Sequence, residues 1–399
     1  MIIEKIVFGI LSIALFTIIF LKMISKNNAT YVYVLAIQFI GMIINFLELF
    51  FNIKLNIIIR LLSYILAIII PIVIILIERI KNISFPELFN YIVANLYLKR
   101  NDIDTAKQYA LKIIENNPRS YSGHKLMAKI YEREENIELA IDEYIKVIEI
   151  NAKDYDSTYV LSELLNKDGR KNEATTILED LLRSTPDNYK ATDLLANIYM
   201  EQERYKEAIN VYMNALKYNS MNYDIYYNLG IVYTMLNDFQ KAKEFYEKAA
   251  ELNNLLYHAD FNLGQIALLY GDLEEAEKYF MKNVQSEEKE AGPYFYLAQI
   301  AILKGEEDKA INYINLAIQM DYRLYEKVIK DPIFYTIKSR IIPNEEKSKP
   351  QIKINEKERK ARKHLEETCV LVGSLNNNDL KAIEKIKSNQ KQKEQRELN

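Results

Sequence analysis

Several residue types that build enzyme and metal sites are scarce in this chain of 399 residues. It holds one cysteine, Cys369, three histidines, ten glycines and no tryptophan. A single cysteine excludes an intrachain disulfide and any zinc site built on several thiolates. His124, His258 and His364 lie too far apart for a motif such as H-E-x-x-H, and no glycine cluster forms a phosphate-binding loop. The sequence therefore predicts no catalytic residue, no cofactor and no metal, and a protein that is not an enzyme.

Charge is nearly absent from three stretches near the N-terminus. Residues 6–21, 27–47 and 61–77 are uncharged runs of 16, 21 and 17 residues. With its flanks, each run is long enough to cross a hydrocarbon core as a helix. We predict a transmembrane region over residues 1–85, with spans at about 4–24, 30–50 and 57–78. The alternative, three buried core helices, fits less well because the runs lack a polar face.

Basic residues around these runs give a weak preference for one orientation. Four lie on one side of the predicted spans and three on the other. The first group is Lys22, Lys26, Arg79 and Lys81, and the second is Lys5, Lys54 and Arg60. Because basic residues favour the cytoplasmic side, we expect a multi-pass protein of the cell membrane with its C-terminal part in the cytoplasm. Glu48 and Arg60 lie at adjoining span ends, where independent snorkelling to the interface is favoured over a functional ion pair.

A period of 34 residues organises the middle of the chain. One alanine recurs in each period, with a small residue twelve positions before it and a large apolar residue, in most periods, four positions after it. The alanines are Ala106, Ala140, Ala174, Ala208, Ala242, Ala276 and Ala310. These offsets place apolar groups on one face of each of two helices per period.

The period and segments such as Tyr226-Tyr227-Asn228-Leu229-Gly230 resemble tetratricopeptide repeats. The resemblance covers residues 87–324 as seven repeats, although the tryptophan frequent in this family is absent. It implies an all-α fold in which helix-turn-helix repeats stack into an α-solenoid. We expect a capping helix at residues 325–343 and a charged, partly helical or disordered tail at 344–399. The abundance of isoleucine, asparagine, lysine and tyrosine suggests a bacterial source.

In this family the first helices of successive repeats line a concave groove that binds ligands. The corresponding positions of repeats five to seven form an apolar stripe with two amides, which suits an extended peptide or an amphipathic helix. The stripe consists of Tyr227, Ile231, Met235, Phe261, Gln265, Leu268, Phe295, Gln299 and Ile302. An equally weighted alternative is that these residues pack repeat against repeat or are covered by the chain's own C-terminal helices.

The sequence thus predicts a membrane-anchored scaffold or adaptor that binds a protein or peptide partner in its groove and contacts lipid through its spans. The alternative is an accessory subunit of a membrane enzyme or transporter, in which the spans make the specific contact. A clamp for a C-terminal carboxylate is disfavoured, because Lys125 and Lys129 of repeat two have no basic counterparts in the next two repeats. The basic tail is interleaved with glutamates and lacks aromatic residues, so no nucleic acid partner is expected.

Overall fold

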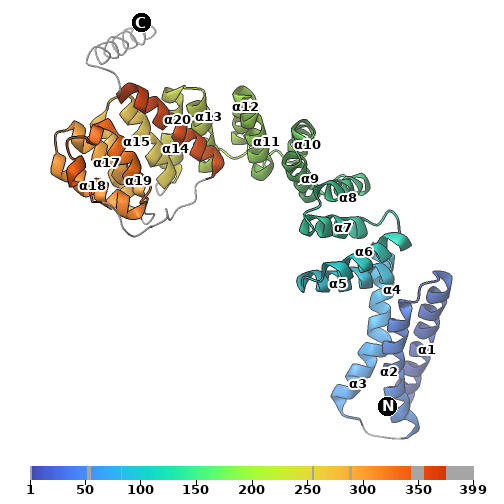
Figure 1. Ribbon diagram of the computed structural model, residues 1–399. Helices are drawn as coiled ribbons and strands as arrows, with labels where there is room; N and C mark the ends of the chain where they lie inside the picture. The colour runs from blue at the N-terminus through green and yellow to red at the C-terminus, as the bar shows by residue number, and fades with distance from the viewer. Residues whose placement is uncertain are drawn as a thin grey trace. The chain divides into compact units, whose positions relative to one another are not determined.

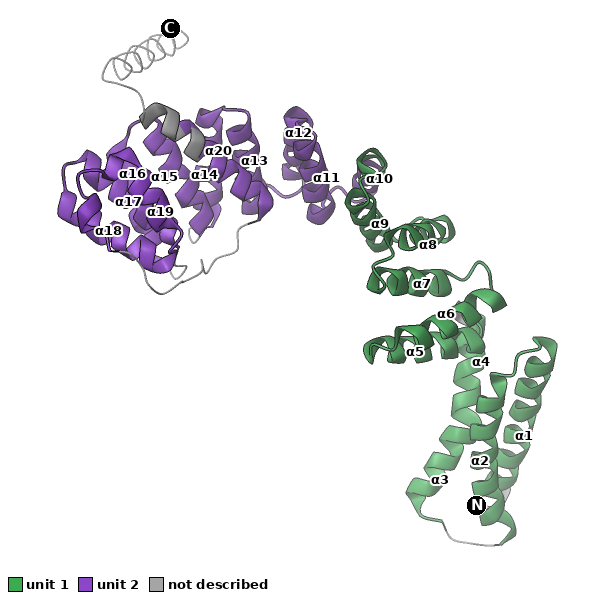
Figure 2. Cartoon of the chain, viewed as in Figure 1, with its two compact units in different colours: residues 1–177 green, residues 178–399 purple. Residues whose placement is uncertain are grey.

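The computed structural model describes residues 2–51, 55–81, 83–253, 256–286, 290–342 and 355–373. These residues form helices and connecting turns, with no strand among them. The all-α solenoid predicted from the sequence is therefore confirmed. The chain divides into two compact units, residues 1–177 and 178–399 (Figure 2). Of the charged tail predicted at 344–399, residues 355–373 are among those described, and the rest lies outside them.

Unit 1 opens with three long apolar helices (Figure 1). The first two are α1 (Ile2–Ser25) and α2 (Tyr31–Phe50). The third combines α3 (Ile57–Tyr64), a π-helical turn η1 (Ile65–Ile69) and α4 (Ile70–Lys81). All three are long and apolar enough to cross a membrane, as expected from the uncharged runs.

Polar side chains hold the interior of this bundle together. The Gln38 amide on α2 donates to the backbone oxygens of Ser12 and Ala67, each at 3.1 Å. Gly41 lies one turn further along α2, where a Cβ atom would stand 2.8 Å from the Ala67 nitrogen and 2.9 Å from the Ser63 oxygen. The missing side chain thus lets α2 approach the third helix closely at its π-helical turn, as small residues do between spanning helices.

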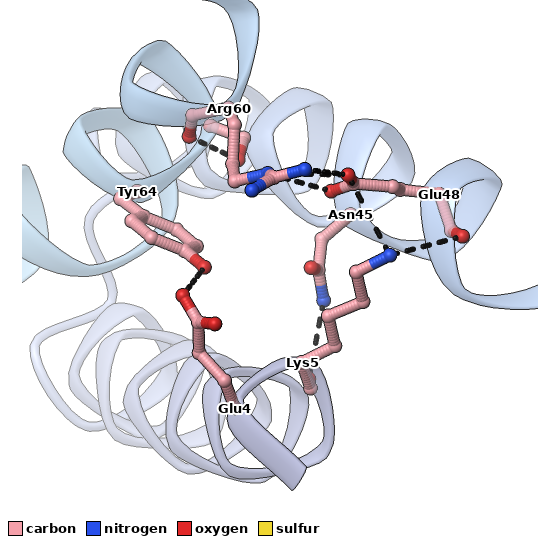
Figure 3. Close-up of polar contacts among 7 residues, drawn as sticks. Glu4, Lys5, Asn45, Glu48, Arg60 and Tyr64 are labelled. Carbon is pink, nitrogen blue, oxygen red and sulfur yellow. Dashed lines mark hydrogen bonds and ion pairs between the residues drawn. The ribbon is translucent and has the colours of Figure 1, made fainter. Parts of the chain in front are cut away.

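Charged residues at one end of the bundle form a cluster (Figure 3). The Glu48 carboxylate accepts hydrogen bonds from the Arg60 guanidinium at 2.5 and 3.1 Å, and the Lys5 ammonium lies 3.5 Å away. Tyr64 donates to the Glu4 carboxylate at 2.9 Å. Glu48 is buried, so it pairs within the bundle instead of snorkelling outward, contrary to the favoured interpretation of the sequence.

The repeats follow as paired antiparallel helices. The first helices are α5 (Phe85–Lys99), α7 (Tyr121–Arg133), α9 (Tyr155–Lys167), α11 (Tyr189–Glu201), α13 (Tyr223–Met235), α15 (Tyr257–Leu269) and α17 (Ala291–Leu303). The second helices are α6 (Ile103–Asn116), α8 (Ile137–Ile150), α10 (Lys171–Ser184), α12 (Tyr205–Leu216), α14 (Phe239–Leu252), α16 (Leu273–Gln285) and α18 (Glu307–Met320).

The first repeat packs directly on the bundle. The Glu78 carboxylate near the end of α4 accepts from the Tyr31 hydroxyl at 2.5 Å and from the backbone N–H of Phe85 at 2.8 Å. The Tyr33 ring of α2 stacks on the Phe89 ring of α5, with centroids 5.0 Å apart. These contacts join the first repeat to the bundle within unit 1.

The turns that join the two helices of each repeat share one feature of backbone geometry. One residue per turn has a positive φ, a conformation that glycine and asparagine adopt most easily. These residues are Asn101, Glu135, Gly169, Glu203, Asn237, Gly271 and Gly305, spaced by 34. In several repeats the next residue caps the second helix, as when the Asp238 carboxylate accepts from the Lys241 N–H at 3.3 Å. The 34-residue spacing thus also fixes where each second helix begins.

The recurring small residue makes room for an aromatic ring. A Cβ atom on Gly230 would lie 2.5 Å from the Tyr246 ring, and one on Gly264 would lie 2.8 Å from the Phe280 ring. Both rings are fully buried. The small residue therefore faces the large residue four positions after the recurring alanine, which defines how the paired helices interlock.

The solenoid ends in a short cap. It comprises α19 (Leu324–Lys330) and two 3-10 turns, Pro332–Phe334 and Lys338–Arg340. Val328, Phe334 and Ile337 are buried against repeats six and seven. The cap covers apolar side chains that the last repeat would otherwise expose.

Candidate functional site

Helix α20 (Glu356–Gly373), from the charged tail, packs against α13 and α15, the first helices of repeats five and six (Figure 1). Both of these helices belong to the face on which the sequence placed the apolar stripe. The groove of unit 2 is therefore occupied by a segment of the same chain.

An apolar contact seats α20 in the groove. Ala361 and Leu365, one turn apart, are fully buried in a cluster that includes Tyr227, Ile231 and Leu263. Residues four apart lie on the same face of a helix, so both side chains enter the groove together. The small Ala361 allows a close approach, and Leu365 fills the space beyond it.

An arginine provides the second contact. The Arg362 guanidinium lies over the Phe261 ring, with its central carbon 4.2 Å from the centroid. It forms ion pairs with Glu290 at 3.0 Å and with Glu358 at 2.6 Å, and only 11% of its side chain is exposed. His258 lies 2.9 Å from the same Glu358 oxygen. The groove thus holds a planar cation between an aromatic face and carboxylates, an arrangement that favours arginine over lysine.

Electrostatics stabilise Glu358 in its charged form. Burial alone raises the pKa of this carboxyl, but the hydrogen bond with His258 and the charge of Arg362 lower it below its ordinary value. Glu358 therefore balances Arg362 within the contact as an anion.

A lysine makes the third contact. The Lys357 ammonium donates to Asp193 on α11 at 2.6 Å. The same carboxylate oxygen accepts from the Tyr212 hydroxyl at 2.8 Å and from the Asn228 amide at 2.9 Å. These donors hold Asp193 in place, so the groove presents a fixed anion where α20 begins.

An open pocket of about 710 Å³ adjoins the N-terminal end of α20 in the groove. Apart from α20, its described lining includes the carboxylates of Asp193, Glu201, Glu203 and Asp224 and no lysine or arginine. Burial, and then the charge of Asp193, raise the pKa of Asp224. The pocket therefore favours a cationic occupant.

Two elements, α20 and the cap, cover parts of the predicted stripe. Tyr227 and Ile231 lie beneath α20. Phe295 lies against Phe334 of the cap, with ring centroids 5.8 Å apart. Phe261 contacts Arg362 and also packs edge-on against the Phe280 ring at 5.6 Å.

The remaining stripe residues have smaller roles in this arrangement. The buried Gln265 donates to the Tyr296 hydroxyl at 2.8 Å. Met235 is half-buried and lines the open pocket. Leu268 and Ile302 pack against the core of repeats six and seven, and Gln299 is half-buried. The stripe is brought together, and much of it also builds the solenoid core.

The sequence predicted Tyr227, Ile231 and Phe261 in the groove, but it did not reveal which residues of α20 enter it, nor that His258 and Glu290 receive Arg362 and Glu358. Glu358, Ala361, Arg362 and Leu365 follow the spacing of one helical face, which was visible in the sequence. The signal was weak because only two of these residues are apolar. The pairing of Lys357 with Asp193 gave no local signal, because the two residues lie 164 positions apart.

Unit 1 has a separate polar cluster on the first helices of repeats two and three. The Asp154 carboxylate accepts from Lys125 at 2.7 Å and from the hydroxyls of Tyr121 and Ser157, each at 2.6 Å. Burial alone raises its pKa, but these hydrogen bonds, that from Lys125 first, hold it well below the ordinary value. Lys125 is therefore engaged within the solenoid. Among the described residues, no group of three metal-binding side chains could hold a metal ion.

Family models for the tetratricopeptide repeat match five stretches of the chain. They cover residues 90–120, 126–154, 196–237, 223–254 and 291–323. No curated protein matches the chain.

Three solved structures are similar to parts of the chain. The C-terminal part of a tetratricopeptide repeat-containing protein from Cytophaga hutchinsonii is 16% identical, over 59% of this chain and 98% of that one, with a TM-score of 0.51. A tetratricopeptide repeat protein from Parabacteroides merdae is 15% identical, over 59% and 93%, with a TM-score of 0.43. YrrB, described as a TPR protein with an unusual peptide-binding site, is 20% identical over 45% and 90%, with a TM-score of 0.37. The matches of the family models and the paired-helix architecture show that the chain contains tetratricopeptide repeats.

Proposed function

We propose that the chain is a membrane-anchored scaffold that binds a partner protein or peptide in the groove formed by α11, α13 and α15. The observation that carries this proposal is α20 itself. A groove that buries Ala361 and Leu365 and pairs Arg362 and Lys357 has the shape and chemistry to receive a helix. Binding an amphipathic helix through spaced anchors is a common mode of peptide recognition.

The N-terminal bundle supports the anchoring part of the proposal. Large apolar side chains such as Ile10, Phe39 and Ile58 are exposed on its outside, whereas Gln38 and Glu48 are buried inside. This distribution suits lipid around the bundle, because polar groups in a membrane need partners within the protein.

The orientation proposed from the basic residues places the repeats and the C-terminus in the cytoplasm. A single thiol introduced at Lys349, with Cys369 replaced, tests this directly. A membrane-impermeant reagent should label it only after the cells are lysed. Strong labelling of intact cells would show that the chain has the opposite orientation.

Photo-crosslinking tests the scaffold function. A photo-reactive residue at Met235, in the pocket, should capture a partner in native membranes, and the same residue at the exposed Met213 on α12 should not. The partner is then identified by mass spectrometry and purified for a direct binding assay. Equal capture from Met235 and Met213 would contradict binding of the partner in the groove.

The alternative, an accessory subunit recognised through its spans, is tested in the same experiment. Replacing the three spans by unrelated apolar helices should leave capture at Met235 intact. Loss of capture would favour the accessory subunit. The buried polar groups of the bundle contact one another and backbone atoms, and they provide no observation in favour of that alternative.

A further inference from the structure

We propose that α20 is an internal ligand: it occupies, within its own chain, the site of a basic amphipathic helix that a partner protein presents. This inference rests on the proposed scaffold function and adds to it the chemistry of the partner and a mechanism that regulates access. In the resting protein, α20 of the same chain occupies the groove.

The pattern of buried residues on α20 defines what the groove recognises. Ala361 and Leu365 enter the apolar part of the groove, and Arg362 enters the site made by Phe261 and Glu290. A partner helix that reproduces this face needs a small residue, an arginine directly after it, and a leucine four positions after the small residue. Lys357 and the buried Glu358 add the contacts with Asp193 and His258, whereas Arg359 faces away with a 66% exposed side chain, so its position is unrestricted.

The charge of the groove defines the rest of the partner. Asp193 is paired with Lys357, and the pocket next to it is lined by three further carboxylates on α11, the turn after it and α13, together with residues at the N-terminal end of α20. A partner helix with additional lysines or arginines at this end would place cations near Glu203 and Asp224. These charge pairs would add to the pair that Lys357 makes with Asp193.

The additional charge pairs of a partner helix provide a means by which it can replace α20 in the groove. Docking of α20 is intramolecular, so its tether gives it a high effective concentration at the groove, and a partner must compete with it. Among the described side chains of α20, Ala361 and Leu365 are the fully buried ones in the apolar part of the contact. A longer basic helix can therefore displace α20, whereas a neutral or acidic helix cannot.

The test uses the full chain in lipid nanodiscs and a fluorescent peptide of residues 355–373 in which Cys369 is replaced by serine. A variant with Ala361→Glu and Leu365→Glu introduces two charges into the apolar part of the groove and releases α20 without changing any residue of the repeats. The peptide should bind this released protein at least tenfold more tightly than the wild type. The same peptide with Arg362→Glu is the matched control and should bind neither protein.

Two extended peptides test the charge of the partner. Three lysines added at the N-terminus should tighten binding to the released protein, and three glutamates should weaken it. The difference should shrink when Asp224 is replaced by asparagine. The reverse order of the two peptides would overturn the assignment of a basic partner.

Three further results would overturn the proposal. Equal affinity of wild-type and released protein would mean that α20 does not occupy the groove in solution. No binding to a released protein whose helix content is intact would mean that the groove does not receive a helix. A wild-type dimer that exchanges α20 between copies, detected by its mass and by crosslinks from Leu365 to the groove of a tagged second copy, would assign the occupant to another chain.

The crosslinking experiment at Met235 separates this inference from the scaffold function. Partner capture that depends on the groove but is unchanged when α20 is released retains the scaffold and rejects the internal ligand. Capture that does not depend on the groove rejects the scaffold itself.

Discussion

Two arginines on α20 lie three residues apart and provide a matched pair of variants. Arg362 faces the groove and contacts Phe261, Glu290 and Glu358. Arg359 faces away and pairs with Glu356, which lies on the same helix and is also exposed. Both are replaced by alanine, so the two variants change charge and helix propensity equally. Any difference between them therefore reports on the groove.

The expected effect of Arg362→Ala follows from the burial of its partners. Only 12% of the Glu290 side chain and 3% of the Glu358 side chain are exposed. Removing one member of a buried ion pair costs about 3–5 kcal/mol, because the other charge stays buried without a partner. A loss of about 3 kcal/mol lowers the ratio of docked to undocked α20 on the order of a hundredfold. The stability that the whole chain loses cannot exceed the free energy of docking α20. Once α20 has left the groove, Glu290 and Glu358 are both exposed to water and no buried charge remains unpaired.

Hydrogen exchange measured by mass spectrometry on the full chain in nanodiscs reads this ratio directly. The amides of α20 should exchange much faster in Arg362→Ala than in the wild type, and at the wild-type rate in Arg359→Ala. The amides of α14 should stay protected in both variants, which shows that the repeats remain folded. Equal protection of α20 in the two variants would refute the assignment of Arg362 as an anchor.

The remaining predictions concern the solenoid, each measured by thermal or chemical unfolding. Gly230→Ala brings a Cβ atom to 2.5 Å from the buried Tyr246 ring, so overpacking of about 1–3 kcal/mol should exceed the gain in helix propensity; an unchanged midpoint would contradict this contact. Glu135→Gly should raise stability by about 0.5–1 kcal/mol, because Glu135 has a φ of 57° that glycine adopts without strain; a lower melting temperature would argue against it. Because the folded pKa of Asp154 is lowered, its stabilising contribution should be complete above its unfolded value near 3.8 and decrease as the pH falls below it. Asp154→Asn should remove that part of the pH dependence, and an unaltered profile would show that Lys125 contributes nothing through this pair.

Much of the fold could be predicted because it follows from local periodicity. The recurring alanines, including Ala106 and Ala310, mark positions that are fully buried in the structure. In five of the seven repeats an asparagine or glycine, such as Asn101 and Gly271, marks the residue of positive φ in the turn, whereas Glu135 and Glu203 give no such signal. Spacing along a helix determines which residues share a face, and a period of 34 repeats that information seven times.

The occupancy of the groove could not be predicted in the same way. Spacing placed Phe261 and Phe295 on the first helices, but it does not determine what covers a face. The covering residues are distant in sequence: Arg362 lies 104 residues after His258, and Lys357 lies 164 after Asp193. A charged segment with two buried apolar residues has little periodic signal. Its docking depends instead on pairs of charges whose partners only the folded solenoid brings together.

The same charge pairs also determine which helices the groove can bind. Ala361 and Leu365 contribute apolar contact that many amphipathic helices could match, so they provide affinity with little discrimination. Arg362 is more restrictive, because only a planar guanidinium can lie on the Phe261 ring while pairing with Glu290. A helix with a neutral residue at that position leaves Glu290 buried without its cation, and that penalty excludes it from the groove. The arginine site therefore selects among helices that the apolar site accepts, and the acidic pocket beyond Asp193 determines which of them can displace α20.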